Sequence, residues 1–273
     1  MKKKINIKGL LVIVATFILL GISLFPYYYM MIQSLTPWKQ VDKVIVPGSF
    51  TLKSYNYLLG SGASAGMWIK SLINSFLVSL PTAIISVVVG LLVGYSVTKM
   101  RNFKGGKFIM NTLLFQMFFP LIILLVPRYM IVKPLINTYA GMILPLSVSA
   151  WGIFMYINYI KTLPNEIFEA ARIDGASELK ILSKIIFPAT KSVTTIVFLS
   201  TFMARWSELM WDMLISPKVD MQTLNVLIST QFKPMGNVPG PMYAASVILT
   251  IPIIIMFLCF SKHFKEGINF MLK

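Results

Sequence analysis

Six long apolar runs constrain this chain more than any other feature of its sequence. A helix needs about 20 mostly apolar residues to cross the hydrocarbon core of a bilayer. Six stretches reach that length: 10–32, 73–97, 108–132, 141–160, 192–215 and 242–261. Backbone polar groups in lipid must hydrogen-bond within the protein, so these spans are predicted to be helices. Only 12% of the residues are charged, against about 25% in soluble domains. The sequence therefore predicts an all-α integral membrane protein with about six transmembrane helices in contact with lipid.

Basic residues are distributed unevenly between the two sides of the membrane. If the N-terminus is cytoplasmic, the cytoplasmic segments hold 16 of the Lys and Arg residues, the outer segments hold eight, and Arg205 lies within the fifth span. Lys and Arg accumulate in the cytoplasmic loops of membrane proteins, so we predict that both termini are cytoplasmic. The net charge of +16 is spread between apolar runs, unlike the basic surface of a nucleic-acid-binding protein. Nucleic acid is therefore not an expected partner.

A charged segment, Lys161–Lys191, separates the fourth and fifth spans. Pro164 suits the first turn of a helix, and Asp174-Gly175 is a strong stop because glycine readily adopts the left-handed conformation that ends a helix. A second helix is expected from about residue 177. Its predicted apolar face consists of Leu179, Leu182, Ile185 and Ile186. On the residues alone, a surface hairpin that only links two spans fits as well as a functional loop.

The spacing within this segment resembles the signature of one transporter family. The run E-A-A at 169–171 is followed after three residues by Gly175 and, after nine more, by Ile185 and then Pro188. This order is similar to the EAA signature of permease subunits of ABC importers. The run from 169 to 177 resembles the carbohydrate-importer branch, which includes the second permease of the maltose transporter. Asn74-Ser75 also opens the second span as family members do.

The resemblance implies a docking role for six small or acidic residues of the charged segment. They are Glu169, Ala170, Ala171, Asp174, Gly175 and Ala176. In this family the signature loop carries a coupling helix that docks in a cleft of a cytoplasmic ATPase. Glu169 would pair with a basic residue of the ATPase, the alanines would permit close contact, and Asp174 with Gly175 would set the turn.

The same resemblance implies the partners and the location of the chain. They are a second homologous permease in a heterodimer, two cytoplasmic ABC ATPase subunits, an extracellular or periplasmic solute-binding protein and a carbohydrate substrate. The assembly would be a multi-pass complex of the bacterial cell membrane, in which this chain forms half of the translocation pathway. Closure of the ATPases on ATP would switch the paired permeases from inward-facing to outward-facing. The sequence does not identify the sugar.

The chain itself carries no nucleotide-binding signature. Its Gly-Gly-Lys at 105–107 lacks the upstream glycine of a P-loop and is followed by Phe108, so a solvated basic turn is the preferred interpretation. ATP hydrolysis is expected on the partner subunits, and this chain is not expected to be an enzyme. A single cysteine, Cys259, and a single histidine, His263, predict neither an intramolecular disulfide nor a metal site. No cofactor is expected.

Five residues are candidates for the substrate pathway: Arg205, Trp206, Glu208, Trp151 and Gln116. An unpaired Arg at the bilayer centre costs about 2.5–3.5 kcal/mol, so Arg205 is expected to face protein or water. Glu208 lies three residues on, on the same helical face, and is the expected partner. One interpretation places Arg205, Trp206 and Glu208 along the outer part of the pathway. The other makes the charged pair a structural contact with the second permease.

Two other classes of membrane protein stay open on the residues alone. An ATP-independent secondary transporter or channel needs ionisable residues deep in several spans, and these are scarce apart from Arg205 and Glu208. A membrane-embedded enzyme needs a nucleophile–base pair or a metal cluster, and neither is visible. We divide the chain into an N-terminal helix with its outer connection at 1–68, an ABC type-1 transmembrane core at 69–262 and a cytoplasmic tail at 263–273.

Overall fold

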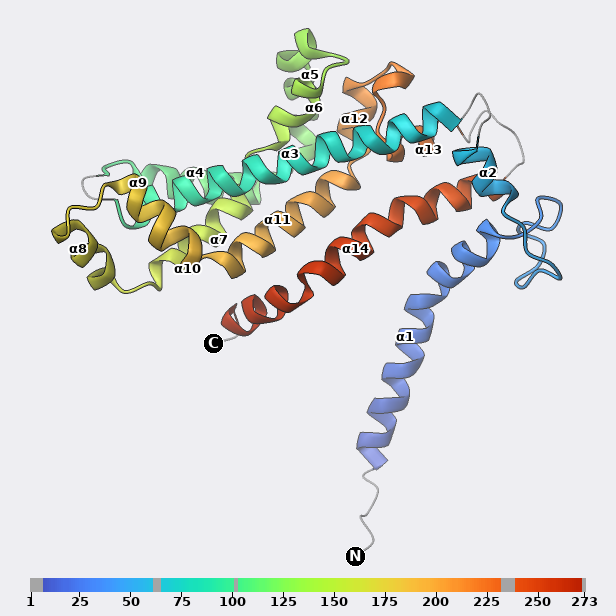
Figure 1. Ribbon diagram of the computed structural model, residues 1–273, viewed down its shortest axis with the longest axis horizontal. Helices are drawn as coiled ribbons and strands as arrows, with labels where there is room; N and C mark the ends of the chain where they lie inside the picture. Colours follow the sequence, from blue (N-terminus) through green and yellow to red (C-terminus); the bar gives the residue numbers. More distant parts are fainter. Residues whose placement is uncertain (1–6, 61–64, 101–102, 232–238, 272–273) are drawn as a thin grey trace, which may run out of the picture. The chain divides into compact units, whose positions relative to one another are not determined.

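The computed structural model consists of helices joined by turns and loops over the residues that it describes (Figure 1). It describes residues 7–60, 65–100, 103–231 and 239–271, and within these ranges side chains are described from Gly9 to Phe260. No strand occurs among the described residues, so the prediction of an all-α fold is confirmed. The side chains of His263 and of the rest of the predicted tail fall outside the described part.

The elements follow one another along the chain with these bounds: α1 Ile7–Ser34, α2 Lys53–Leu59, α3 Ala65–Thr98, α4 Gly106–Phe118, η1 Leu121–Leu124, α5 Leu125–Val132, η2 Lys133–Leu135, α6 Tyr139–Ile143, η3 Leu144–Leu146, α7 Ala150–Lys161, α8 Asn165–Ile173, α9 Glu178–Ile181, the π-helix η4 Leu182–Ile186, α10 Phe187–Ala189, α11 Lys191–Trp206, α12 Met210–Ile215, η5 Val219–Met221, α13 Leu224–Gln231 and α14 Pro239–Met271.

Three helices are long and apolar enough to cross a membrane without a break. They are α1, α3 and α14, and they contain the predicted spans 10–32, 73–97 and 242–261. Other apolar segments are bent: α4 meets the Leu121–Leu135 segment at 98°, the Tyr139–Leu146 segment meets α7 at 45°, and the Glu178–Ala189 segment meets α11 at 79°. If each bent pair is one span, the described chain has up to six. The number of crossings and their orientation stay predictions.

The fifth predicted span, 192–215, is wrong in its second half, because a break separates α11 from α12. Helix ends leave carbonyl and N–H groups without intrahelical partners, and polar side chains supply them here. Asn225 Nδ2 donates to the carbonyl of Ser207 at 2.8 Å. The carboxylate of Glu208 accepts the backbone N–H of Trp211 at 3.0 Å. The break is therefore a stable local structure.

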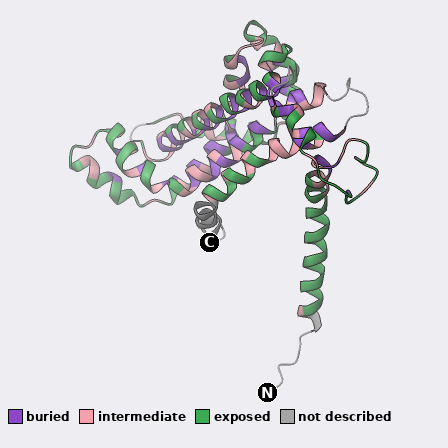
Figure 2. Ribbon diagram, turned by 45° about the vertical axis from the view of Figure 1, so that its right-hand side comes forward, coloured by how far each residue is buried: buried purple, intermediate pink, exposed green. Residues whose placement is uncertain are grey.

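The chain forms two compact units. Met1–Ile69 and Ile228–Ile251 form the first unit, and Lys70–Leu227 and Pro252–Lys273 form the second. Figure 2 shows how burial differs along the chain: the apolar stretch of α1 has no buried residue, whereas 39% of the corresponding stretch of α3 is buried. An exposed apolar helix is what a lipid-facing segment requires.

In the first unit, Asp42 connects α1 with α14. Its carboxylate accepts hydrogen bonds from the hydroxyls of Tyr29 at 3.0 Å and Tyr243 at 2.6 Å. The two tyrosine rings also meet edge to face, with centroids 6.0 Å apart. This cluster fixes the end of α1 to the beginning of α14.

In the second unit, two glycines allow α3 to pack closely against α7. A Cβ atom built at Gly94 would lie 2.7 Å from the Cβ of Tyr156, and one built at Gly90 would lie 2.7 Å from the ring of the same tyrosine. Small residues at this spacing let helix backbones approach each other in membranes. The fully buried Tyr156 also donates to Thr194 of α11 at 2.7 Å, so the three helices form one packed core.

Gly94→Ala is expected to lower the unfolding temperature of the detergent-solubilised chain, although alanine favours a helix over glycine by about 1 kcal/mol. The added methyl group meets Tyr156 close to its backbone, and overpacking of this kind costs about 1–3 kcal/mol. Gly21→Ala is the matched control, because a Cβ built there meets no neighbouring atom within 4 Å. Equal stability of the two variants would contradict the close packing of α3.

Candidate functional site: a helical hairpin and a membrane cavity

The charged segment folds as two short helices joined by a tight turn. α8 ends just before Gly175, whose φ of +77° lies in the left-handed region that glycine tolerates best. The N–H of Ala176 donates to the carbonyl of Ala171 at 2.9 Å and closes the turn. The hydroxyl of Ser177 then caps α9 by accepting the N–H of Lys180. The predicted helix–Gly175–helix arrangement is confirmed.

Two details of the hairpin differ from the prediction. Pro164 is the N-cap residue of α8 and does not lie in its first turn. Leu179, which was expected on the buried face, is 73% exposed, whereas Ile181 and Ile186 are fully buried. These two isoleucines lie five residues apart in the sequence, and α9 continues into the π-helix η4 between them. A π-helix bonds residue i to i+5 and so shifts the regular helical spacing.

The six docking candidates divide between the two faces of the hairpin. The exposed ones are Glu169, Ala170, Asp174 and Gly175, and the half-buried ones are Ala171 and Ala176. The two half-buried alanines pack against the core of the second unit. The hairpin therefore presents one small and acidic surface outward while its other face is anchored.

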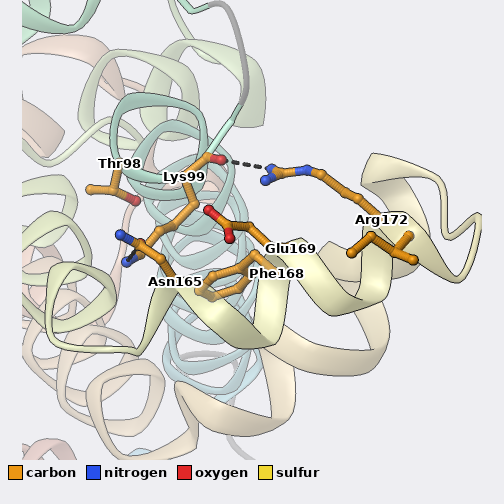
Figure 3. Close-up of a pocket in the computed structure, with 7 residues that line it drawn as sticks. Thr98, Lys99, Asn165, Phe168, Glu169 and Arg172 are labelled. Carbon is orange, nitrogen blue, oxygen red and sulfur yellow. Dashed lines mark hydrogen bonds between the residues drawn. The ribbon is translucent and has the colours of Figure 1, made fainter.

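A polar network holds the hairpin against the C-terminal end of α3. Arg172 donates through Nη2 to the carbonyl of Lys99 at 2.7 Å (Figure 3) and through Nε to the carboxylate of Glu178 at 3.1 Å. The hydroxyl of Tyr95 donates to the second carboxylate oxygen of Glu178. The hydrogen bond from Tyr95, together with Arg172, lowers the pKa of Glu178 below its ordinary value. The carboxylate is therefore charged at neutral pH, and the network is intact there.

Lys99 adds further contacts from the end of α3. Its Nζ donates to the carbonyl of Leu163 at 2.7 Å and to Oδ1 of Asn165 at 2.6 Å, and it lies 5.2 Å from the ring centroid of Phe168. A cavity of about 540 Å³ adjoins these groups, and Figure 3 shows the side chains around it. Its lining residues are Thr98, Lys99, Asn165, Phe168, Glu169, Arg172 and Ile173. Glu169 is thus both exposed and at the wall of a cavity.

Four of the five pathway candidates line a second cavity, of about 450 Å³. They are Gln116, Trp151, Arg205 and Glu208. Sequence reasoning missed further polar groups of the same wall, namely Thr82, Arg128, Ser149, Ser200 and Thr201. The wall therefore combines an aromatic ring with an amide, hydroxyls and charged groups, which is the chemistry of a site for a polar ligand.

The expected pairing of Arg205 with Glu208 is wrong. Arg205 is 4% exposed and forms an ion pair with Asp212, which is fully buried. Its Nη1 donates to Oδ2 of Asp212 at 2.9 Å, and its Nη2 also donates to the carbonyl of Met142 at 3.2 Å. Glu208 is instead used to cap α12, as described above. The break after α11 brings Asp212 to Arg205, seven residues along the chain.

Trp206 does not line the cavity. It is 2% exposed and its ring meets Phe76 edge to face at 4.7 Å and stacks on Phe202 at 5.5 Å, measured between centroids. The adjacent Arg205 lies on a different face of α11. Trp206 is therefore a packing residue between α3 and α11. Within the part of the chain that the structure describes, no three His, Cys, Asp or Glu side chains gather as a metal site requires.

Comparison with known proteins gives a consistent result. Residues 86–269 match the family described as binding-protein-dependent transport system inner membrane component. The chain is 29% identical over 255 residues to the arabinooligosaccharides transport system permease protein AraQ of Halalkalibacterium halodurans, covering 91% of this chain and 90% of that protein. It is 28% identical over 272 residues to the sn-glycerol-3-phosphate transport system permease protein UgpE of Escherichia coli, covering 93% and 94%.

Two solved structures share the fold. A chain of a bacterial ABC transporter involved in the import of the acidic polysaccharide alginate superposes with a TM-score of 0.82, at 21% identity, covering 95% of this chain and 97% of that one. A chain of the MetNI methionine ABC transporter in an inward-facing conformation superposes with a TM-score of 0.56, at 19% identity, covering 76% and 99%.

Asp212→Ala is expected to destabilise the folded chain by about 3–5 kcal/mol, because it leaves the guanidinium of Arg205 buried without its counter-charge. Glu208→Ala is the comparison. It also removes a carboxylate from this region, but that carboxylate only caps a backbone N–H, a contact that stabilises a protein by about 0.5–2 kcal/mol. Thermal or denaturant unfolding in detergent measures both. A larger loss of stability for Glu208→Ala than for Asp212→Ala would contradict the ion pair between Arg205 and Asp212 as the main stabilising contact of this region.

Proposed function

The chain belongs to the family of binding-protein-dependent transport system inner membrane components, and from that premise we propose separate roles for the hairpin and for the cavity beside Arg205. The protein is a multi-pass permease subunit of an ATP-driven importer of the bacterial cell membrane, and permeases of this kind are not themselves enzymes. We propose that the α8–α9 hairpin couples it to cytoplasmic ATPases. We also propose that the cavity beside Arg205 is part of the path of a carbohydrate.

The observation that carries the coupling role is the exposed surface of α8 next to a fixed left-handed turn. Glu169 and Ala170 are exposed, whereas Ala171 and Ala176 attach the hairpin to the core. An exposed carboxylate flanked by alanine lets a partner helix or cleft approach closely and orients it by charge. The adjoining cavity of about 540 Å³ has room for a side chain of the ATPase. The coupling role requires the hairpin to be in the cytoplasm, where the distribution of basic residues predicts it.

The transport cycle that we propose needs partners. A second, homologous permease would supply the other half of the pathway, two ATPase subunits would bind the two hairpins, and an external solute-binding protein would deliver the substrate. ATP would be hydrolysed on the ATPase subunits. Their closure would move the hairpins and switch the permease pair between inward-facing and outward-facing states. The division of the chain at 68/69 and 262/263 belongs to the same proposal.

A carbohydrate or a polyol derivative is the substrate class that we propose. The relatives are named for transport of arabinooligosaccharides and of sn-glycerol 3-phosphate, both rich in hydroxyl groups. The cavity offers Trp151 as an aromatic surface and Gln116, Ser200 and Thr201 as hydrogen-bonding groups. Arg205 is neutralised by Asp212, so it adds donors to the wall without adding an unbalanced charge.

Glu169→Lys and Gly175→Leu are expected to abolish uptake while leaving the chain inserted in the membrane. The first reverses the charge offered to the ATPase, and the second puts a branched side chain at a φ that L-residues avoid. The measurements are copurification of the ATPase with the chain and uptake of labelled solute in cells. Lys180→Glu, a charge reversal at another exposed position of the hairpin, is the control. Normal uptake by both variants would overturn the assignment of this hairpin.

Trp151→Ala is expected to reduce uptake by up to about tenfold, since one aromatic contact contributes about 0.5–1.5 kcal/mol. Copurification of the ATPases should stay unchanged, because Trp151 lines the cavity beside Arg205 and not the cavity at the hairpin. Arabinotriose and sn-glycerol 3-phosphate are suitable probes, with uptake rates measured in cells. Phe17→Ala, which removes a 72% exposed ring from α1, is the control. Equal rates for the two variants would exclude Trp151 from the pathway.

A further inference from the structure

Arg172 connects three helices with a single side chain. It belongs to α8, it bonds to Glu178 at the start of α9, and it bonds to the carbonyl of Lys99 at the end of α3. Its side chain is 22% exposed and that of Glu178 is 39% exposed, so the pair is shielded in part from solvent. A guanidinium can make both bonds at once because its donors form a rigid fork, which a lysine lacks. The docking surface at Glu169 is left free by this arrangement.

Nearer its N-terminal end, nine residues after the helix begins, α3 is held by Asn74, which is 1% exposed. Its Nδ2 donates to the carbonyls of Asp220 and Gln222, both at 3.0 Å. Its Oδ1 accepts the hydroxyl of Tyr139 at 2.7 Å. The amide therefore ties α3 to the segment around η5 and to α6. The next residue, Ser75, accepts the backbone N–H of Leu224 at 2.8 Å and continues this contact.

These two sets of contacts are separated by the thickness of a membrane. The 21 residues from Asn74 to Tyr95 correspond to about 31 Å of helix, close to the hydrocarbon thickness of about 30 Å. Between them, Thr82 of α3 lines the cavity beside Arg205. α3 is thus joined to the hairpin, to the cavity wall and to the segment around η5, none of which is its neighbour in sequence.

We propose that Arg172 and Asn74 are positioning residues that make α3 the element transmitting hairpin movement to the opposite side of the membrane. A displacement of the hairpin pulls on the end of α3 through Arg172, Lys99 and Tyr95. Because Asn74 bonds the N-terminal part of α3 to Asp220 and Gln222, the movement reaches the segment around η5 and shifts the cavity wall. The inference rests on the proposed function, in which ATPases move the hairpin. A shared helix is a physical link whose coupling can be measured.

The test uses the full complex of this chain with its second permease, both ATPases and the solute-binding protein, in proteoliposomes. A spin label is attached at Lys218→Cys, an exposed position beside η5, after the exposed native cysteine is removed as Cys259→Ser. The readout is the change in the label's spectrum when ATP and Mg²⁺ are added. Copurification of the ATPases is measured in parallel for every variant.

Arg172→Gln and Asn74→Ala are each expected to reduce the ATP-dependent change at least about fivefold while the ATPases stay bound. The double variant should lose no more than the more severe single variant, because the two contacts act in series. Arg172→Lys should be intermediate. Lys180→Gln, which removes an exposed positive charge from the same hairpin, should respond like the unmodified chain.

The outcomes separate this proposal from the one on which it rests. If ATPases fail to copurify with the unmodified chain, the coupling function itself is wrong. If they copurify and the label does not respond to ATP, or if Arg172→Gln responds fully, transmission through α3 is wrong while docking stands. Additive losses in the double variant would mean that the two residues act independently, which also overturns the serial link.

Discussion

Lipid offers no hydrogen-bond partners, so every break in a membrane helix must satisfy its own backbone groups. In this chain two of the breaks are stabilised by polar side chains. Asn225 and Glu208 serve the carbonyl and N–H groups between α11 and α12. Thr138 and Ser149 cap the two halves of another bent segment by accepting the N–H groups of their third neighbours. Bends that would otherwise be costly become fixed elements, and they bring cavity-lining residues together.

The buried ion pair between Arg205 and Asp212 depends on one of these breaks. Two buried charges are tolerated only when they pair and bond well, and a continuous helix would have carried Asp212 away from its partner along α11. The pair joins α11 to α12 and, through the carbonyl of Met142, to α6. Arg205 also faces the cavity. The ion pair therefore places a guanidinium at the cavity wall together with its counter-charge.

Sequence reasoning succeeded where the signal is local. Apolar length alone predicts α1, α3 and α14, and Gly175 predicts the turn of the hairpin because few other residues tolerate its φ. It failed where the local structure depends on contacts with residues that are distant in the sequence. The break at Ser207 is stabilised by Asn225, 18 residues away. The sequence also gives no sign of the π-helical turn at Leu182–Ile186, which interrupts the regular spacing of the predicted apolar face. Among the cavity residues it found four with large polar or aromatic side chains, but it missed Arg128 and the serines and threonines, which are common in any span.

The π-helix η4 also sets the orientation of the hairpin about the axis of the helix that follows. Each residue of an α-helix rotates the chain by about 100°. The π-helical turn holds one residue more than an α-helical turn, so a deletion that converted it to a regular turn would leave the flanking helices facing nearly as they do now. A deletion elsewhere between Gly175 and Pro188 has no such turn to absorb it and would rotate the face that carries Glu169 without altering any of its side chains. The number of residues in this interval therefore sets a direction as well as a length.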